Sequence, residues 1–226
     1  MSTFYAPDLA AQDALYHLSE DESKHCVKVL RMQEGAAIEL VNGKGLQAHC
    51  VLETAHAKRS VLRVVTQIQH APTLSLHIAM APTKNLDRIE WFLEKATELG
   101  LSKLTFLLCE HSERKQLNLE RLEKIAVAAM KQSKRYFLPQ IEPLVPFEAF
   151  VEKYPKGYFG HCEEGPKIGL AALLPDLPFL IGPEGDFSSK EIQLAHQAGY
   201  QAVDMSAFRL RTETAALLAT TALLRN

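Results

Sequence analysis

The chain has 226 residues, of which 47% are hydrophobic and 23% charged, and its formal net charge is −2. These proportions are those of a globular protein, so they exclude a disordered or fibrous chain, and the net charge by itself does not indicate nucleic-acid binding. The length allows one large domain or two small ones.

The sequence carries no sign of a membrane anchor, a secretion signal or a metal site. The longest apolar run, AALLATTALL near the end, is too short to span a membrane, and MSTFYAPDLAAQD lacks the order of a signal peptide. The four cysteines show no CxxC spacing, and three directly follow a histidine, an arrangement that rarely supplies two ligands to one metal. We expect a cytoplasmic protein with reduced, mostly buried thiols, no metal and no membrane partner.

Residues 1–71 contain short strand-like pieces separated by turn signals. GAAIELVNGKGLQAHCVLE alternates apolar and polar residues on both sides of Asn42-Gly43, which predicts a hairpin, and RSVLRVVTQIQ alternates again. Before them, DESKHCVKVLRM predicts a brief helix with basic residues at helical spacings, among them Lys28 and Arg31. Together these pieces predict a small barrel or sandwich over residues 1–71, followed by a linker at Ala71-Pro72-Thr73.

From residue 72 onward, strands alternate with helices. LSLHIAMA and LTFLL are typical of buried strands, and NLDRIEWFLEKATELG between them predicts an amphipathic helix ended by Gly100. LERLEKIAVAAMKQSKR predicts a second amphipathic helix. YFGH, PFLIG and QAVDM indicate further strands, whereas SSKEIQLAHQAG and the residues from Thr212 indicate further helices. The alternation predicts a mainly parallel sheet covered on both faces, in an α/β domain over residues 72–226.

A basic stretch interrupts the otherwise neutral chain. Residues 111–135 contain seven Lys or Arg against three Glu, a local charge of +4. Such a stretch is either a surface that faces RNA or the solvated side of one helix. Charge alone favours the solvated helix.

The turn Gly182-Pro183-Glu184-Gly185 lies between the strand FLI and a predicted helix start, and core packing does not require it. Ligands of parallel α/β sheets bind beyond the carboxyl ends of the strands. The two glycines permit positive φ and a close backbone approach, while Ser188 and Glu191 form a capping box that fixes the helix start. The acidic turn has no Lys, so it favours a positively charged ligand or an adenosine over a phosphate. A merely tight connection is the alternative.

The second candidate stretch is FRLRTETAALLATTALL. Arg209 and Arg211 stand two positions apart, so in an extended segment both side chains would point the same way. Thr212 is a candidate helix cap, and Glu213 in the first turn complements the helix dipole. An arginine fixed just before a helix can bind a phosphate or a developing negative charge, although alone it would more often form a surface salt bridge.

These stretches resemble the SPOUT superfamily of knotted RNA methyltransferases and, more narrowly, the bacterial 16S rRNA (uracil-N3)-methyltransferases of the RsmE type. The matching pieces, in family order and spacing, are HCVKVLR, EWFLEKATELG, SERK, KQSKR, IGPEGDFS and LRTETA. The resemblance implies an α/β SPOUT methyltransferase domain with a deep trefoil knot, a feature that sequence pattern could not reveal. It also implies a PUA-like β-barrel that binds RNA, over residues 1–71, and a homodimer.

By this resemblance, the protein uses S-adenosylmethionine to methylate N3 of a uridine in 16S rRNA, naked or within the small ribosomal subunit or its precursor. The expected catalytic residue is Arg211, and Glu184 and Glu213 are candidate general bases. The expected cofactor-binding residues are Leu180, Ile181, Gly182, Glu184, Gly185, Met205, Leu210, Arg211 and Thr212. The expected RNA-binding residues are Lys28, Arg31, Arg114, Lys131, Lys134, Arg135 and Arg209.

Other functions stay open from the sequence alone. One alternative is a SPOUT methyltransferase that acts on a different RNA nucleotide. Another is a non-catalytic RNA-binding or ribosome-assembly protein, against which the intact GPEG and LRTETA stretches argue. A nucleotide-dependent enzyme is disfavoured, because the chain lacks GxGxxG and GxxxxGK[ST].

Overall fold

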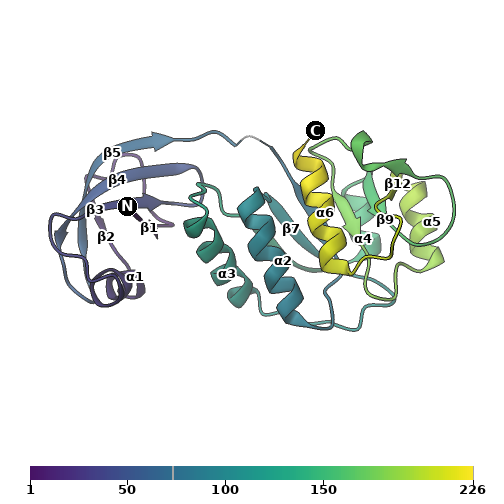
Figure 1. Ribbon diagram of the computed structural model, residues 1–226, viewed down its shortest axis with the longest axis horizontal. Coiled ribbons are helices and arrows are strands. Elements are labelled where there is room, and N and C mark those ends of the chain that lie inside the picture. Colours follow the sequence, from purple (N-terminus) through teal and green to yellow (C-terminus); the bar gives the residue numbers. More distant parts are fainter. Residues whose placement is uncertain (73, 226) are drawn as a thin grey trace. The chain divides into compact units, whose positions relative to one another are not determined.

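The computed structural model describes residues 1–72 and 74–225, which form two compact units (Figure 1). The first unit is Met1–Pro72 together with Met130–Leu138, and the second comprises the rest of the described chain. Thr73 of the expected linker and Asn226 at the end of the expected second domain lie outside the described residues. No helix of the described chain is long and apolar enough to cross a membrane.

The first unit is built on a five-stranded sheet in the order β1-β3-β4-β5-β2. The hairpin predicted at Asn42-Gly43 is confirmed, because β3 and β4 pair antiparallel and Gly43 takes the left-handed φ of +73°. Phe4, Ile38 and Leu52 are fully buried in the core of this unit. The strands are β1 (Ser2–Tyr5), β2 (Leu15–His17), β3 (Ala37–Val41), β4 (Leu46–Thr54) and β5 (Val61–Gln69).

The brief helix predicted before the hairpin is present but has two parts. α1 (Glu20–Lys24) continues into a π-helical turn, η1 (His25–Val29), after which Arg31 has a φ of +54°. The expected helical spacing therefore does not hold as far as Arg31, because the wider turn and the left-handed residue change the direction of the backbone. Lys28 and Arg31 are both exposed there.

Residues 130–138 belong to the first unit although they follow a large part of the second in sequence. They are reached through α3 (Leu119–Gln132). The Gly45 N–H donates to the carbonyl of Tyr136 at 2.9 Å, and the Leu138 N–H donates to the carbonyl of Gly43 at 2.9 Å. The imidazole of His70 stacks on the Tyr136 ring with 3.8 Å between centroids.

The second unit contains a seven-stranded sheet in the order β10-β12-β9-β11-β6-β7-β8. Every pairing in it is parallel, which confirms the predicted parallel sheet. Its strands are β6 (His77–Met80), β7 (Lys103–Leu108), β8 (Gln140–Pro146), β9 (Gly157–Gly160), β10 (Ile168–Gly169), β11 (Phe179–Ile181) and β12 (Tyr200–Asp204).

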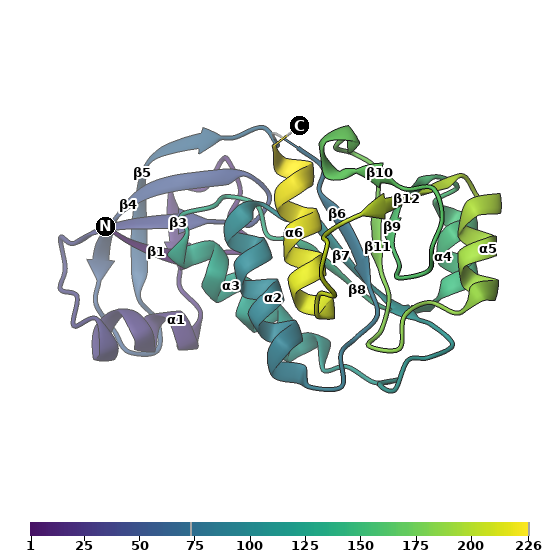
Figure 2. The same cartoon turned by 45° about the vertical axis from the view of Figure 1, so that its right-hand side comes forward.

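Helices cover both faces of this sheet, as predicted. α2 (Leu86–Leu99) and α6 (Thr212–Leu224) lie side by side on one face, and α4 (Phe147–Lys153) and α5 (Ser189–Gln197) lie on the other (Figures 1 and 2). Leu107 and Leu180 belong to the core under α4 and α5, whereas the neighbouring Phe106 and Ile181 are buried toward the opposite face. A short 3₁₀ turn, η2 (Leu170–Ala172), follows β10.

The parallel pairing decides where a ligand can bind. β9 lies between β11 and β12, so the loops that follow these three strands leave the same edge of the sheet. The loop after β11 ends at the predicted capping box, in which Ser188 and Glu191 bond reciprocally. The structure therefore brings residues 161–167, 182–188 and 205–211 to one place.

Candidate functional site

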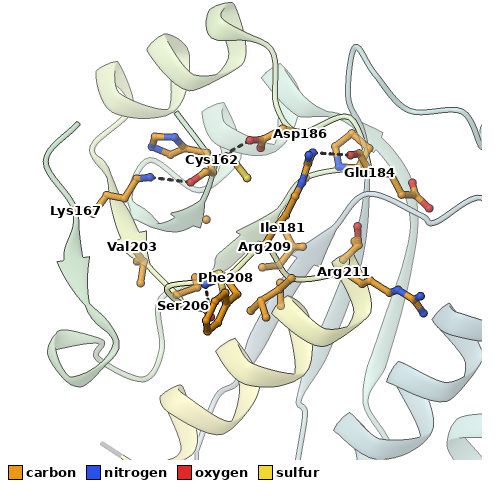
Figure 3. A pocket seen from close by; sticks show the side chains of 18 of the residues that line it. Cys162, Lys167, Ile181, Glu184, Asp186, Val203, Ser206, Phe208, Arg209 and Arg211 are labelled. Atoms are coloured by element: carbon orange, nitrogen blue, oxygen red, sulfur yellow. Dashed lines mark hydrogen bonds between the residues drawn. The ribbon is translucent and has the colours of Figure 1, made fainter. Parts of the chain in front are cut away.

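The three loops enclose a cavity of about 650 Å³ (Figure 3). This volume lies within the range of small-molecule sites. Ile181 and Val203 line it from the ends of β11 and β12, Arg88 from the start of α2, and Thr212 from the start of α6. Four separate stretches of the second unit thus meet at the carboxyl edge of its sheet.

Hydrogen bonds hold the loop after β9 in place. Asp186 Oδ2 accepts the backbone N–H of Cys162 at 2.7 Å, which ties this loop to the one after β11. The ammonium group of Lys167 donates to the carbonyls of His161 and Glu163 at 2.9 and 2.7 Å. All of these bonds are charge-assisted, so the loop has a defined shape.

Glycines allow the loops to pack closely. A Cβ at Gly160 would lie 2.5 Å from Met205 Sδ, and one at Gly182 would lie 3.1 Å from the backbone nitrogen of Phe187. Neither turn glycine takes the positive φ that glycine permits. The left-handed residue of the turn is Asp186, at φ +66°, whose short polar side chain tolerates this conformation.

The wall of the cavity carries charges of both signs. The acidic side chains are engaged, since Glu184 Oε1 accepts the backbone N–H of Lys84 at 3.0 Å and Asp186 holds Cys162. The basic lining residues outnumber these two carboxylates, so the wall as a whole is not acidic. They are Arg88, Lys167, Arg209 and Arg211.

The three cavity arginines differ in what they contact. Arg88 Nε lies 3.6 Å from Glu213 Oε1, and the Arg209 guanidinium donates to the carbonyl of Glu184 at 3.5 Å. The side chain of Arg211 is exposed and forms no hydrogen bond or ion pair with any described residue. Figure 3 shows Arg209 extending toward Glu184 and Arg211 in another direction. The expectation that both point the same way is wrong, because the Glu184 carbonyl holds the Arg209 guanidinium.

α6 begins at Thr212, as predicted, but its cap differs from the expectation. The N-cap residue is Arg211, so Thr212 is the first helical residue and does not cap the helix. Glu213 lies in the first turn, as predicted, and is only 7% exposed. Its Oε2 has no hydrogen-bond partner among the described residues, and its Oε1 faces Arg88. Arg88 was not predicted, because in the sequence it is only a basic residue near a helix start.

His161 brings an unpartnered polar side chain to the cavity. Its ring stacks on Phe159 with 4.9 Å between centroids, and both ring nitrogens are buried without a hydrogen-bond partner in the described chain. Burial, assisted by the charge of Lys167, lowers the pKa of His161. The sequence offered His161-Cys162 only as a doubtful metal pair, and no group of three or more metal-ligating side chains occurs among the described residues.

Most of the expected cofactor-binding residues line the cavity. Leu180 and Gly185 do not: alternation along β11 turns Leu180 into the core under α4 and α5, and Gly185 packs against His111. Those that line it are Ile181, Gly182, Glu184, Met205, Leu210, Arg211 and Thr212.

The expected RNA-binding residues fall into both units. In the second unit, Arg209 lines the cavity, whereas the Arg114 guanidinium donates to the carbonyls of Thr83 and Lys84. The others lie in the first unit, namely Lys28, Arg31, Lys131, Lys134 and Arg135.

Within the first unit these basic residues have different surroundings. Lys28, Arg31 and Lys134 are exposed, and Lys134 takes a left-handed φ of +55°. Lys131 is partly buried, bonds Glu22 Oε1 at 2.5 Å and lies over the ring of Phe4. Charge alone did not reveal this ion pair, which links α3 to α1.

Family models of known proteins match both units. An RNA methyltransferase domain matches residues 69–224, and an RNA methyltransferase PUA domain matches residues 18–65. A protein of Synechocystis named ribosomal RNA small subunit methyltransferase E is 31% identical over 92% of this chain and 72% of its own. A protein of Rickettsia conorii with the same name is 27% identical over 95% of this chain and 91% of its own.

Solved structures match nearly the whole chain. A probable rRNA-methyltransferase from Porphyromonas gingivalis is 36% identical, with a TM-score of 0.87 over 98% of this chain and 96% of its own. A ribosomal RNA small subunit methyltransferase E from Neisseria gonorrhoeae, bound to S-adenosyl methionine, is 26% identical, with a TM-score of 0.87 over 100% and 97%. These matches confirm the predicted fold class, while the trefoil knot stays a prediction.

Proposed function

The chain belongs to the RNA methyltransferase family, and from that membership we propose that it methylates N3 of a specific uridine in small-subunit (16S) ribosomal RNA, with S-adenosylmethionine as the methyl donor. The relatives named for small-subunit RNA support the substrate, and the Neisseria relative with its bound donor supports the cofactor. The observation that carries the proposal is a cavity of donor size whose wall includes the guanidinium of Arg211, which bonds no residue in the described chain.

The cavity fits this donor in its size, its backbone and its polar groups. Gly160 and Gly182 let the three loops close around it, and the buried nitrogens of His161 lack a partner. Ile181, Met205 and Leu210 supply apolar wall, while the basic residues suit the carboxylate of a methionine moiety. S-adenosylmethionine supplies a methyl group that is already activated on a positively charged sulfur. Residues of all three loops would hold it.

The task left to the protein is to place uracil N3 in line with that methyl group. Positioning of this kind supplies about 7–11 kcal/mol in ideal intramolecular cases. N3 is protonated and, in a helix, paired, so the base must be unpaired or splayed out before it can reach the cavity. A rigid edge of a parallel sheet with tied loops is suited to this task, since each loop bond reduces the freedom of the wall.

The role proposed for Arg211 is to stabilise the negative charge that develops on the uracil. When the N3 proton leaves to solvent, negative charge gathers on the two uracil carbonyl oxygens. This charge is lost again as N3 takes the methyl group, which breaks the sulfur–methyl bond and leaves the donor as a neutral thioether. A guanidinium whose donors are uncommitted can bond these oxygens without first breaking another contact. Glu184 and Glu213 are not assigned as general bases, because Glu184 bonds Lys84 and Glu213 faces Arg88.

The proposal extends to how the RNA is held. The substrate is 16S rRNA, naked or within the small ribosomal subunit or its precursor, and the protein acts as a homodimer in the cytoplasm. The PUA domain match and the exposed Lys28, Arg31 and Lys134 of the first unit support an RNA-binding role for that unit. Arg209 is positioned at the cavity to bind a phosphate beside the target base.

Arg211→Ala tests the catalytic assignment. We expect kcat for methyl transfer to small-subunit RNA to fall by about 10²–10³-fold, the usual cost of removing one donor to a developing oxyanion. The fold should be intact, because the side chain is exposed and bonds no described residue. Incorporation of labelled methyl groups into RNA measures the rate, and circular dichroism checks the fold.

Arg225→Ala, at the other end of α6, is the matched control and should keep wild-type turnover. Near-normal turnover of Arg211→Ala would remove Arg211 from the mechanism. Mass mapping of 16S rRNA from cells that lack the protein identifies the modified nucleotide. If the methyl group that is missing in these cells belongs to a position other than uridine N3, the proposed target is wrong.

A further inference from the structure

Phe208 is an apolar side chain that does not pack into the core. It is 83% exposed, more than any other large apolar side chain in the described part of the chain. It nevertheless lines the cavity, and Figure 3 shows its ring beside Ser206 on the loop that leads to Arg209 and Arg211. No described residue covers this ring, so its faces are available to a group outside the chain.

The loop holds this ring in a defined position. The backbone N–H of Phe208 donates to Ser206 Oγ at 3.1 Å, and the next residue, Arg209, bonds the carbonyl of Glu184. No aromatic or cation–π contact engages the ring within the described residues. An exposed aromatic ring on an anchored loop can stack on another flat ring without first being ordered.

We propose that Phe208 is the stacking platform for the target base, which it holds by its flat face at the mouth of the cavity. This inference rests on the proposed function. An unpaired base exposes its π-face, and proteins bind such bases by stacking them on aromatic side chains. The flanking arginines complete the site, since Arg209 suits a phosphate and Arg211 the base oxygens. Phe208 thus supplies affinity and orientation, whereas hydrogen bonds select uracil.

Two other occupants are less well supported by the same surroundings. The adenine of the donor already finds apolar wall inside the cavity, at Ile181, Val203 and Leu210, whereas Phe208 stands almost entirely in solvent. A second copy of the chain that covered Phe208 would also cover the neighbouring Arg211, and burying an unpaired guanidinium is costly. RNA with an unpaired base can contact both, because the base stacks on the ring and the phosphate and base oxygens bind the arginines.

The experiment compares Phe208→Ala and Phe208→Trp with the wild type. We expect the Kd for a 16S rRNA transcript, measured by filter binding with S-adenosylhomocysteine present, to rise about 5- to 150-fold in Phe208→Ala. Phe208→Trp, which keeps a stacking face, should bind RNA within about threefold of wild type. Calorimetry with S-adenosylhomocysteine should give the same Kd for all three proteins. Leu174→Ala is the control, because Leu174 is 61% exposed in the same unit and does not line the cavity.

Each contrary result identifies a different failure. An unchanged Kd for RNA in Phe208→Ala overturns the inference outright. A weakened Kd for S-adenosylhomocysteine assigns the ring to the donor instead, and a changed mass in light scattering assigns it to a second copy. A wild type that binds RNA through Phe208 but transfers no methyl group refutes the proposed function and leaves the stacking site standing. A wild type that binds no RNA overturns both.

Discussion

Gly182 shows at the scale of a single residue why the loop after β11 needs glycine. An added Cβ would lie 3.1 Å from the backbone nitrogen of Phe187 and 3.2 Å from its ring. The backbone of Phe187 cannot rotate away from this contact as a flexible side chain could. The contact at Gly160 is shorter, 2.5 Å, but its partner is the sulfur of Met205, near the end of a flexible side chain. The contact at Gly182 is therefore harder to relieve than the contact at Gly160, although it is longer.

Gly182→Val should weaken the binding of S-adenosylmethionine by at least about tenfold, because the loop must move to relieve a clash that costs roughly 1–3 kcal/mol. Gly160→Ala should have a smaller effect, since Met205 can adopt another rotamer. Gly169→Ala is the matched control, as a Cβ there meets nothing within 4 Å. Titration calorimetry measures the affinities. Equal affinity in Gly182→Val and Gly169→Ala would show that this turn does not shape the donor site.

Single residues of the site were predictable only where a local pattern marked them. The IGPEGDFS and FRLRTETA stretches contain more than half of the residues that line the cavity. Arg88 and His161 were missed, because they reach the cavity through pairing between distant strands and helices that one sequence does not display. The ion pair of Lys131 was missed for a related reason, since its partner, Glu22, lies 109 residues earlier.

At the scale of elements, β6 carries a buried histidine that couples the fold to pH. His77 Nε2 donates to Thr105 Oγ1 at 2.9 Å, since that hydroxyl itself donates to Glu142. Phe150 and Tyr154 of the α4 region pack edge-on against its ring. Burial, followed by the positive charge of Lys103, lowers the pKa of His77 to about 4. The imidazole is therefore neutral in the folded protein near neutral pH.

This histidine should make the protein less stable in acid. Below about pH 6.5 an unfolded histidine binds a proton, whereas folded His77 does so only near pH 4. Between these values the unfolded state gains protons, so the free energy of unfolding should fall as pH falls, by roughly 3 kcal/mol in all. Urea unfolding at pH 7.5 and 5 measures it. His77→Gln keeps a donor for Thr105 and cannot titrate, so its stability should depend less on pH. An identical dependence in both proteins would contradict the argument.

Elements with a strong local pattern were predictable, and those that break a local rule were not. The hairpin, the helix α2 with its glycine end and the capping box of α5 all follow from spacing. β8 was missed because Pro143 and Pro146 argue against a strand, but β8 is an edge of the sheet, where a missing N–H is tolerated. β10 is only two residues long, and the π-helical turn η1 has no sequence signature of its own.

At the scale of the whole molecule, the basic residues of the first unit should determine how RNA affinity depends on salt. Lys28, Arg31 and Lys134 are exposed and form no ion pair with described residues. Lys131 is already paired with Glu22. Each exposed cation that contacts a phosphate releases counterions, and each such contact steepens the loss of affinity with salt.

Replacing Lys28, Arg31 and Lys134 together with Ala should reduce the slope of log K against log salt by about 2–3, at roughly 0.7–0.9 per phosphate contact. Lys58→Ala is the control, because Lys58 is exposed in the same unit but lies 3.8 Å from Glu20. Filter binding of 16S rRNA over a range of salt concentrations gives the slopes. If the triple variant kept the wild-type slope, these residues would be an ordinary solvated surface.

The return of residues 130–138 has a consequence for how the protein is made. Synthesis delivers the chain from its N-terminus, and the first unit draws hydrogen bonds from Tyr136 and Leu138. A nascent chain that has emerged only as far as Pro72 therefore lacks part of what closes its own first unit, which must wait until α3 has left the ribosome. For the same reason, a gene cut after Pro72 separates the first unit from residues 130–138, so recombination that exchanges the whole unit must cut in more than one place.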